Sequence, residues 1–285
     1  MITSIIFSKD RALQLDLTLR SIKRNFSESS DLVVLYKVSD HTHEFSYEIL
    51  EKEYPEVTFE KQSDDEWGLF GDIERLIANS SQDYICFFTD DNIVYNKVNL
   101  AGSNLSNIFE NQMSCLSLRL GLNTNMRDYG DGIPRADCLP QLDLREPFLV
   151  WNRTSIPVGG YWSYPLSVDG HIFQKDAIRS FAKELNILNH VLQWKQTPNE
   201  FESKLQRFWF DLPPMMSSFR QSCVVNSPNN RVQTTTENWH GRKFSFNAES
   251  LRDKFLDGRR IQIDKINFRN IACPHQELDI LEAVV

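Results

Sequence analysis

Apolar and polar positions divide the first 90 residues into blocks that predict strands and helices in turn. Four apolar runs have the length and composition of strands, at residues 4–7, 32–38, 57–60 and 84–88. One helix face between the first two runs is marked by Leu15, Leu19, Ile22 and Phe26. Shorter helical stripes follow at positions 47, 50 and 54 and at positions 73, 76 and 77. This order predicts a doubly wound α/β fold with a mostly parallel central sheet and helices on both faces.

The pattern changes after about residue 121. Residues 123–140 are rich in Asn, Asp, Gly and Pro, which predicts a long loop. Residues 147–173 carry many aromatic and turn-forming residues, which predicts strands of mixed direction. Another helix is indicated by apolar positions within residues 177–185. We therefore expect a single domain over residues 1–285, with a first half at residues 1–120 and a mixed-sheet second half with a C-terminal extension at residues 121–285.

Composition and charge exclude several classes of protein. A chain of 285 residues can bury a sizeable core, and a net charge of -8 argues against a basic face for nucleic acid. The N-terminus lacks the pattern of a signal peptide, and no apolar run approaches the roughly 20 residues that cross a bilayer. The five cysteines form no C-x-x-C pair, which argues against a zinc ribbon or a disulfide framework. We expect a cytoplasmic protein that does not bind nucleic acid.

A cluster of oxygen-bearing side chains follows the fourth apolar run directly, in the order Thr89, Asp90, Asp91 and Asn92. In doubly wound sheets the ligand crevice lies beyond the carboxyl ends of the strands. Carboxylate and amide oxygens are the ligands that Mg²⁺ and Mn²⁺ prefer. In an extended chain Asp91 points away from its neighbours, so a turn is needed to bring it round. A metal site and a turn that merely closes the strand both remain open.

Two segments of the chain resemble the nucleotide-sugar glycosyltransferases of the GT-A fold, family 2 in particular: SIIFSKDRALQLDLTLRSI at residues 4–22 and TDDN at residues 89–92. The resemblance covers the first half well and the second half loosely. These enzymes carry a D-x-D motif that binds a divalent cation bridging the nucleotide diphosphate. Asp90-Asp91-Asn92 matches this motif with Asn in its last place. The resemblance implies a cofactor of Mn²⁺ or Mg²⁺ and leaves open whether Asp91 or Asn92 binds it.

The same resemblance implies which residues hold the nucleotide, because in this family the first two strands end at the nucleobase and ribose. The matching positions are Ser8, Lys9 and Arg11 after the first strand and Asp40 after the second, with Asp90 beside the metal. Lys9 and Arg11 would offset the charge of the diphosphate, and Asp40 would accept from a nucleobase N–H.

Plain structural roles are the alternatives near these strand ends. Asp40 is equally suited to a turn. Asp10 is predicted to be the N-cap of the first helix rather than a ligand.

The family commonly places its catalytic base near the start of a helix in the second half. An inverting enzyme needs this carboxylate to take the proton of the acceptor hydroxyl. Thr197, Pro198 and Glu200 predict a capping box, which gives Glu200 a structural role. Glu202 has no such duty and is the predicted base, with Asp169 in SVDGHIF as its rival. A solvated helix charge and a plain turn are the alternatives for these two residues.

Aromatic and histidine residues of the second half supply the last candidates. The aromatic side chains either line an acceptor site or cover the sheet as core; they are Trp151, Tyr161, Trp162 and Tyr164. GT-A enzymes often add a C-terminal histidine to the metal shell. His240 is the predicted ligand and His275 the alternative, and an imidazole suits Mn²⁺ better than Mg²⁺.

Together these features predict a metal-dependent glycosyltransferase of the hexosyltransferase type. Inversion is the predicted stereochemistry, and retention, which would need no such base, stays open. The enzyme would move a sugar from a nucleotide-diphosphate sugar, bound by the first half, to a hydroxyl acceptor bound by the second. The acceptor would be the hydroxyl of a glycan or of a lipid-linked molecule, and the reaction would belong to polysaccharide or glycan biosynthesis. The enzyme would associate peripherally with a membrane. One alternative is a nucleotidyltransferase on a related fold, although FSKDRA lacks the expected glycine-rich loop. Another is a catalytically inactive nucleotide- or sugar-binding module.

Overall fold

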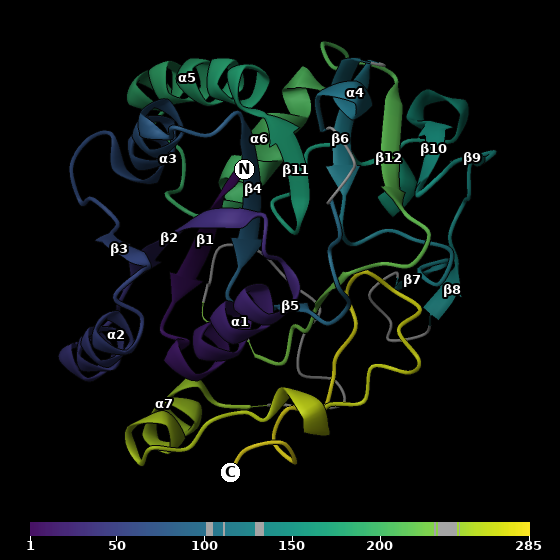
Figure 1. The fold of residues 1–285 in the computed structure, drawn as a ribbon. Helices are drawn as coiled ribbons and strands as arrows, with labels where there is room; N and C mark the ends of the chain where they lie inside the picture. Colours follow the sequence, from purple (N-terminus) through teal and green to yellow (C-terminus); the bar gives the residue numbers. More distant parts are fainter. Residues whose placement is uncertain (101–104, 111, 129–133, 231, 233–243, 245) are drawn as a thin grey trace.

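A nine-stranded sheet forms the centre of the computed structural model, which describes residues 1–100, 105–110, 112–128, 134–230, 232, 244 and 246–285 (Figure 1). Across the sheet the strands are β3 (Thr58–Lys61), β2 (Ser29–Lys37), β1 (Ile2–Lys9), β4 (Tyr84–Thr89), β11 (His171–Gln174), β6 (Met113–Ser117), β12 (Met215–Phe219), β10 (Phe148–Asn152) and β9 (Asp143–Arg145). Two small sheets pair β5 (Asn92–Val94) with β13 (Val224–Asn226) and β7 (Met126–Asp128) with β8 (Pro134–Ala136).

Strand direction separates the two halves of the large sheet. Strands β3, β2, β1 and β4 are parallel, as the alternating pattern of the first 90 residues predicts. Strand β11 is antiparallel to both of its neighbours, β4 and β6, and β10 is antiparallel to β12. The predicted α/β fold with a mostly parallel central sheet and a mixed second part is therefore confirmed.

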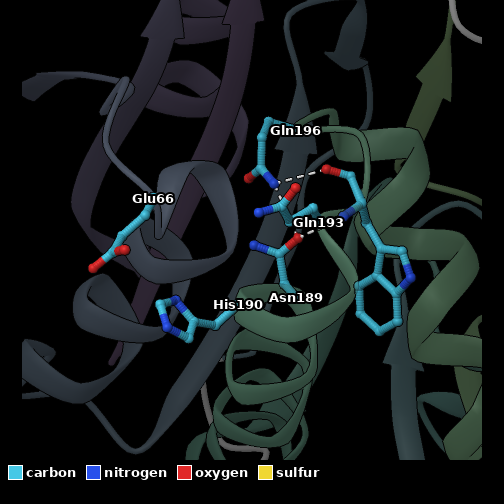
Figure 2. A pocket seen from close by; sticks show the side chains of 6 residues that line it. Glu66, Asn189, His190, Gln193 and Gln196 are labelled. Carbon is cyan, nitrogen blue, oxygen red and sulfur yellow. Dashed lines mark hydrogen bonds between the residues drawn. The ribbon is translucent and has the colours of Figure 1, made fainter.

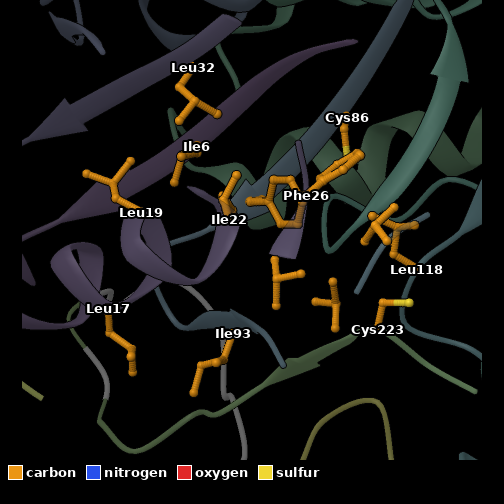
Figure 3. Packing of buried hydrophobic residues seen from close by; sticks show 14 of the residues in the cluster. Ile6, Leu17, Leu19, Ile22, Phe26, Leu32, Cys86, Ile93, Leu118 and Cys223 are labelled. Carbon is orange, nitrogen blue, oxygen red and sulfur yellow. The ribbon is translucent and has the colours of Figure 1, made fainter. Parts of the chain in front are cut away.

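Helices cover both faces of this sheet. One face carries α1 (Ala12–Asn25), α2 (His41–Glu53) and α7 (Ala248–Leu256), and the other carries α3 (Gly68–Asn79), α5 (Lys175–Leu192) and α6 (Pro198–Leu205). Helix α4 (Leu105–Glu110) packs near β6. The sheet has a hydrophobic core on each face: the first lies under α1, α2 and α7, and the second under α3, α5 and α6. Because successive side chains of a strand point to opposite faces, Ile6 of β1 belongs to the first core, and Ile5 and Phe7 belong to the second. Figure 3 shows the first core, in which Leu19 and Ile22 lie against the sheet.

Two predictions about local structure are wrong. Residues 126–128 and 134–136 form the β7–β8 pair, because a composition rich in turn residues does not prevent short strands from pairing. Asp10 does not cap α1. Its backbone has φ 55°, and its carboxylate accepts hydrogen bonds from the backbone N–H and the hydroxyl of Ser39, so it joins the ends of β1 and β2 instead. Among the described residues, none of the helices combines the length and hydropathy that crossing a bilayer requires.

Candidate active site

Asp90 and Asp91 lie in the tight turn that joins β4 to β5, at the carboxyl end of β4. The turn brings both carboxylates to one guanidinium. Arg11 Nη1 is 2.9 Å from Asp90 Oδ1 and 3.0 Å from Asp91 Oδ2. Two acidic side chains that would point apart in an extended strand therefore meet at one cation.

Asp90 is bound to the end of β1 as well. Its Oδ2 accepts hydrogen bonds from the Ser8 hydroxyl at 2.9 Å and from the Lys9 backbone N–H at 3.0 Å. Burial raises the pKa of Asp90 to about 6, although Arg11 opposes this shift. The candidate residues Ser8, Lys9, Arg11 and Asp90 are thus one hydrogen-bonded group.

Asp91 and Asn92 face the second half of the chain. Asp91 Oδ1 accepts from Asn226 Nδ2 at 2.7 Å and from the Thr89 hydroxyl at 2.8 Å. Asn92 is fully buried, and its Oδ1 accepts from the Thr89 backbone N–H at 3.0 Å. Asn92 Nδ2 donates to Asp169 Oδ1 at 3.2 Å, so both polar atoms of this amide have partners within the protein.

Asp169 lies beside the acidic turn although 77 residues separate it from Asn92 in sequence. The Thr89 hydroxyl, which carries a single proton, lies 2.9 Å from Asp169 Oδ1 and also contacts Asp91. Arg119 Nη1 is 3.1 Å from Asp169 Oδ2. Burial alone would raise the pKa of Asp169, but the charge of Arg119 and hydrogen bonds from Thr89 and Asn92 lower it. Asp169 is therefore held as a carboxylate.

The ring of His275 is oriented by Asn226. His275 Nδ1 is 3.0 Å from Asn226 Oδ1, and Asn226 turns this oxygen toward the ring because its Nδ2 donates to Asp91. Nδ1 is therefore the protonated nitrogen of the neutral ring, and the Nε2 lone pair faces Asp169 Oδ2 at 3.5 Å. Burial, followed by the charge of Arg119, lowers the pKa of His275 to about 4. A cation placed between His275 Nε2 and the Asp169 carboxylate would be attracted by both groups.

His240, the histidine predicted as a metal ligand, lies outside the described residues. His275 is the histidine that the structure brings to the acidic turn. Within the described parts of the chain, no three His, Cys, Asp or Glu side chains form a ready-made metal site.

Helix α6 begins as predicted and brings Glu202 toward Asp169. The Thr197 hydroxyl accepts from the Glu200 backbone N–H at 3.2 Å, and Pro198 occupies the first turn. The reciprocal half of the predicted capping box is wrong, because Glu200 forms an ion pair with Lys204 at 3.0 Å while the Thr197 backbone N–H donates to a backbone carbonyl.

Glu202 is partly buried, and its Oε1 accepts from the Val168 backbone N–H at 3.1 Å. Burial and then the charge of Asp169 raise the pKa of Glu202 to about 7. The pKa of Glu202 is thus raised toward neutrality, whereas that of Asp169 is lowered.

The remaining candidates divide into core and site. Trp151 and Trp162 are core, since both are almost fully buried and Trp151 Nε1 donates to the Trp162 carbonyl at 2.8 Å. Tyr161 stacks on His275 with ring centroids 5.7 Å apart and lies under the Arg119 guanidinium. Asp40 follows β2 and caps α2, where it accepts two backbone N–H groups, and its carboxylate is exposed.

Sequence reasoning missed three residues that connect this cluster: Thr89, Arg119 and Asn226. Arg119 is the single charged residue in the apolar stretch SCLSLRLGL, at residues 114–122, and that isolation is a usable signal for a buried ion pair. Thr89 was noted only as part of the acidic stretch, and nothing in its local sequence indicates the role of Asn226. Both matter here because distant segments meet at them.

A surface pocket lies apart from this cluster, at the end of α5 (Figure 2). Its volume is about 440 Å³, and it is lined by Glu66, Asn189, His190, Gln193, Trp194 and Gln196. Gln196 Nε2 donates to Asn189 Oδ1 at 3.0 Å and to the Trp194 carbonyl at 2.9 Å. These bonds fix the connection that leads from α5 into α6.

Fold and site together define an α/β protein with a carboxylate-rich cluster beyond the end of a central parallel strand. No protein-family model matches the chain. The chain is similar to the bifunctional glycosyltransferase pgtA of Dictyostelium discoideum, with 25% identity over 214 residues that make up 70% of this chain and 27% of that protein. It thus spans about a quarter of the length of this curated relative. The similarity confirms the predicted resemblance to glycosyltransferases.

Solved structures of S. aureus TarS, residues 1–349, are also similar. The complex with UDP-GlcNAc has a TM-score of 0.48 and 12% identity, covering 90% of this chain and 65% of that one. The complex with UDP has a TM-score of 0.48 and 14% identity, covering 78% of this chain and 59% of that one.

Proposed function

We propose that this chain is a glycosyltransferase that moves a sugar from a nucleotide-diphosphate sugar to a hydroxyl acceptor. The observation that carries the proposal is the placement of Glu202 beside Asp169, which Thr89 and Asn92 connect to the acidic turn at Asp91. A proton acceptor and a carboxylate-rich site for a charged donor thus belong to one network. The similarity to a curated glycosyltransferase supports the same class.

Glu202 is the general base of this proposal. Its carboxylate takes the proton from the acceptor hydroxyl while that oxygen bonds to the anomeric carbon, and the bond from this carbon to the diphosphate oxygen breaks with inversion. The pKa of about 7 suits this task, because a base acts best with a pKa near the working pH. Asp169 is a poorer choice, since its lowered pKa makes it a weaker base and its two oxygens already contact Thr89 and Arg119.

The donor set fits a divalent cation. Asp91 supplies carboxylate oxygen and His275 a neutral nitrogen whose lone pair faces Asp169, and this mixed set suits Mn²⁺. We propose Asp91 rather than Asn92 as the ligand of the acidic turn, because both polar atoms of Asn92 are bonded within the protein. A cation bound here would act as a Lewis acid on the leaving diphosphate.

The residues at the ends of β1 and β2 form the donor side of the site. Ser8 and Asp90 fix the end of β1, and Lys9 and Arg11 bring positive charge for the diphosphate. Asp40 is the proposed nucleobase contact, since its carboxylate is exposed at the end of β2. We propose a glycan or lipid-linked saccharide as the acceptor.

Donor binding followed by transfer tests the proposal. UDP-, GDP-, CMP- and dTDP-sugars are screened by thermal shift with and without Mn²⁺, and the correct donor should raise the midpoint in a concentration-dependent way. The same donor should then be hydrolysed slowly when Mn²⁺ is present. Binding without any hydrolysis would favour an inactive binding module, and the absence of binding by all donors would contradict the proposed function.

A further inference from the structure

A positive charge already lies between the two acidic residues of the β4–β5 turn. The Arg11 guanidinium contacts Asp90 and Asp91 through the same nitrogen, Nη1, and Nη2 donates to the backbone carbonyl of Asn230. Burial alone would lower the pKa of Arg11, but the two carboxylates outweigh it, so the pKa is raised. Arg11 is thus a charged, largely buried counter-ion of the acidic turn.

The contacts of Asp91 leave no oxygen without a donor. Oδ1 accepts hydrogen bonds from Asn226 and Thr89, and Oδ2 accepts one from Arg11. Oδ2 has a single donor and keeps a free lone pair, and a cation that binds this oxygen lies beside the Arg11 guanidinium. Asn226 and Thr89 are neutral, whereas Arg11 carries a charge that repels an incoming metal at short range in a buried site. The ion pair with Arg11 is the contact most opposed to metal binding.

Asp90 can keep the guanidinium when Asp91 gives it up. The Asp90 carboxylate is fixed by the Ser8 hydroxyl and the Lys9 backbone N–H, and it retains its own contact with Arg11. The two neighbouring carboxylates therefore have different partners available: Asp90 is committed to β1 and Arg11, and Asp91 can exchange Arg11 for another cation.

We propose that Arg11 is a resident counter-ion that competes with the divalent cation for Asp91 and so sets the metal affinity of the site. This inference rests on the metal site of the proposed function. In the absence of metal, the guanidinium neutralises Asp91. Metal binding is favoured when the guanidinium moves away from Asp91 and stays with Asp90. Arg11 thereby acts as a positioning residue toward the metal rather than only as a contact for the donor.

Titration of Mn²⁺ alone, followed by the loss of its free-ion signal in electron paramagnetic resonance, tests the competition. Arg11→Gln removes the competing charge and should bind Mn²⁺ about tenfold or more tightly than the unsubstituted protein. Arg20→Gln is the matched control, because Arg20 also pairs with a carboxylate, Asp16, and with a backbone carbonyl, that of Ile261, outside the site. Its Mn²⁺ affinity should be unchanged.

Two further variants keep the test decisive. Adding Asp91→Asn to Arg11→Gln should abolish the gain, which assigns the gain to this carboxylate. Arg11→Lys keeps a charge but not the planar guanidinium, so its affinity should lie between those of the unsubstituted protein and Arg11→Gln, and it replaces Arg11→Gln if the latter does not fold.

Equal or weaker Mn²⁺ binding by the Arg11 variants would overturn the competition, and so would an Mn²⁺ affinity undetectable in every protein. The measurement uses no nucleotide sugar. If the Arg11 variants show no gain in Mn²⁺ affinity but donor binding and sugar transfer are normal, the role of Arg11 is wrong and the proposed function is unaffected.

Discussion

Two carboxylate clusters meet at this site, and each surrounds one buried arginine. The first cluster contains Asp90 and Asp91 around Arg11, at the ends of the adjacent strands β1 and β4. The second contains Asp169 with Arg119, and Glu202 lies close to both. The first is built from two neighbouring strand ends, whereas the second is assembled from segments that are far apart in the sequence.

The clusters differ in how they hold protons. In the first, burial raises the pKa of Asp90 to about 6 even though Arg11 contacts it directly. In the second, Asp169 has a lowered pKa while its neighbour Glu202 has a pKa of about 7. Two adjacent carboxyl groups with separated pKa values are the arrangement of an acid–base pair. We propose that the first cluster binds the cation and the second transfers the proton.

The largest expected effect is on turnover. Glu202→Gln keeps the size of the side chain and removes its ability to accept a proton, so kcat should fall at least about 100-fold while donor binding is unchanged. Steady-state kinetics and calorimetric titration of the donor measure the two quantities.

Glu200→Gln is the matched control on the same helix. Glu200 pairs with Lys204 on a partly exposed face, so its substitution should leave turnover almost unchanged. Near-normal turnover of Glu202→Gln would pass the role of base to Asp169 or indicate a retaining reaction. A folded but inactive Glu200→Gln would show that the wrong glutamate had been assigned.

The next effect is on the first cluster. Asp91→Asn removes the anionic ligand that we propose and should weaken Mn²⁺ binding at least about tenfold, since even indirect partners of a metal contribute on that scale. Asp65→Asn is a suitable control, because Asp65 accepts backbone N–H groups in a turn outside the site. If the Mn²⁺ affinity of Asp91→Asn in calorimetric titration is unchanged, the metal binds elsewhere, and the first cluster is not the metal site.

A third prediction concerns pH and acts on the second cluster. Because Glu202 must be ionised to accept a proton, kcat/KM should fall as pH drops below about 7, approaching tenfold per pH unit. Ser167 lowers the pKa of Glu202 through a hydrogen bond, so Ser167→Ala should move this limb to higher pH by a fraction of a unit. A profile that is flat between pH 5 and pH 8 would exclude Glu202 as the base.

The difference between the clusters also explains what the sequence could predict. The strands and helices of the first 90 residues follow from the period of their apolar positions, and a parallel sheet brings the ends of β1 and β4 to one edge. The acidic turn could thus be located from TDDN alone. Asp10 was misassigned because a short polar residue before a helix suits a cap and a strand-end link to Ser39 equally well.

The second cluster could be predicted only in part. The position of Glu202 near the start of α6 could be predicted, because Thr197 and Pro198 mark the beginning of this helix in the sequence. Asn226 and His275 come together through a backbone bridge between distant segments, and no periodic pattern records such a contact. Sheet order decides their place, since β11 lies between β4 and β6 and brings Asp169 to the acidic turn.

The smallest expected effect separates stability from activity. Thr197 caps α6 and Asp40 caps α2, so Thr197→Ala and Asp40→Asn act on comparable helix starts in the two halves. Thr197→Ala removes the cap and should lower the free energy of unfolding by about 1 kcal/mol, whereas Asn replaces Asp as a cap at little cost. Urea denaturation measures both changes. Because α6 carries Glu202, Thr197→Ala should also lower kcat, and a stability loss with kcat untouched would show that the base does not depend on the start of its helix.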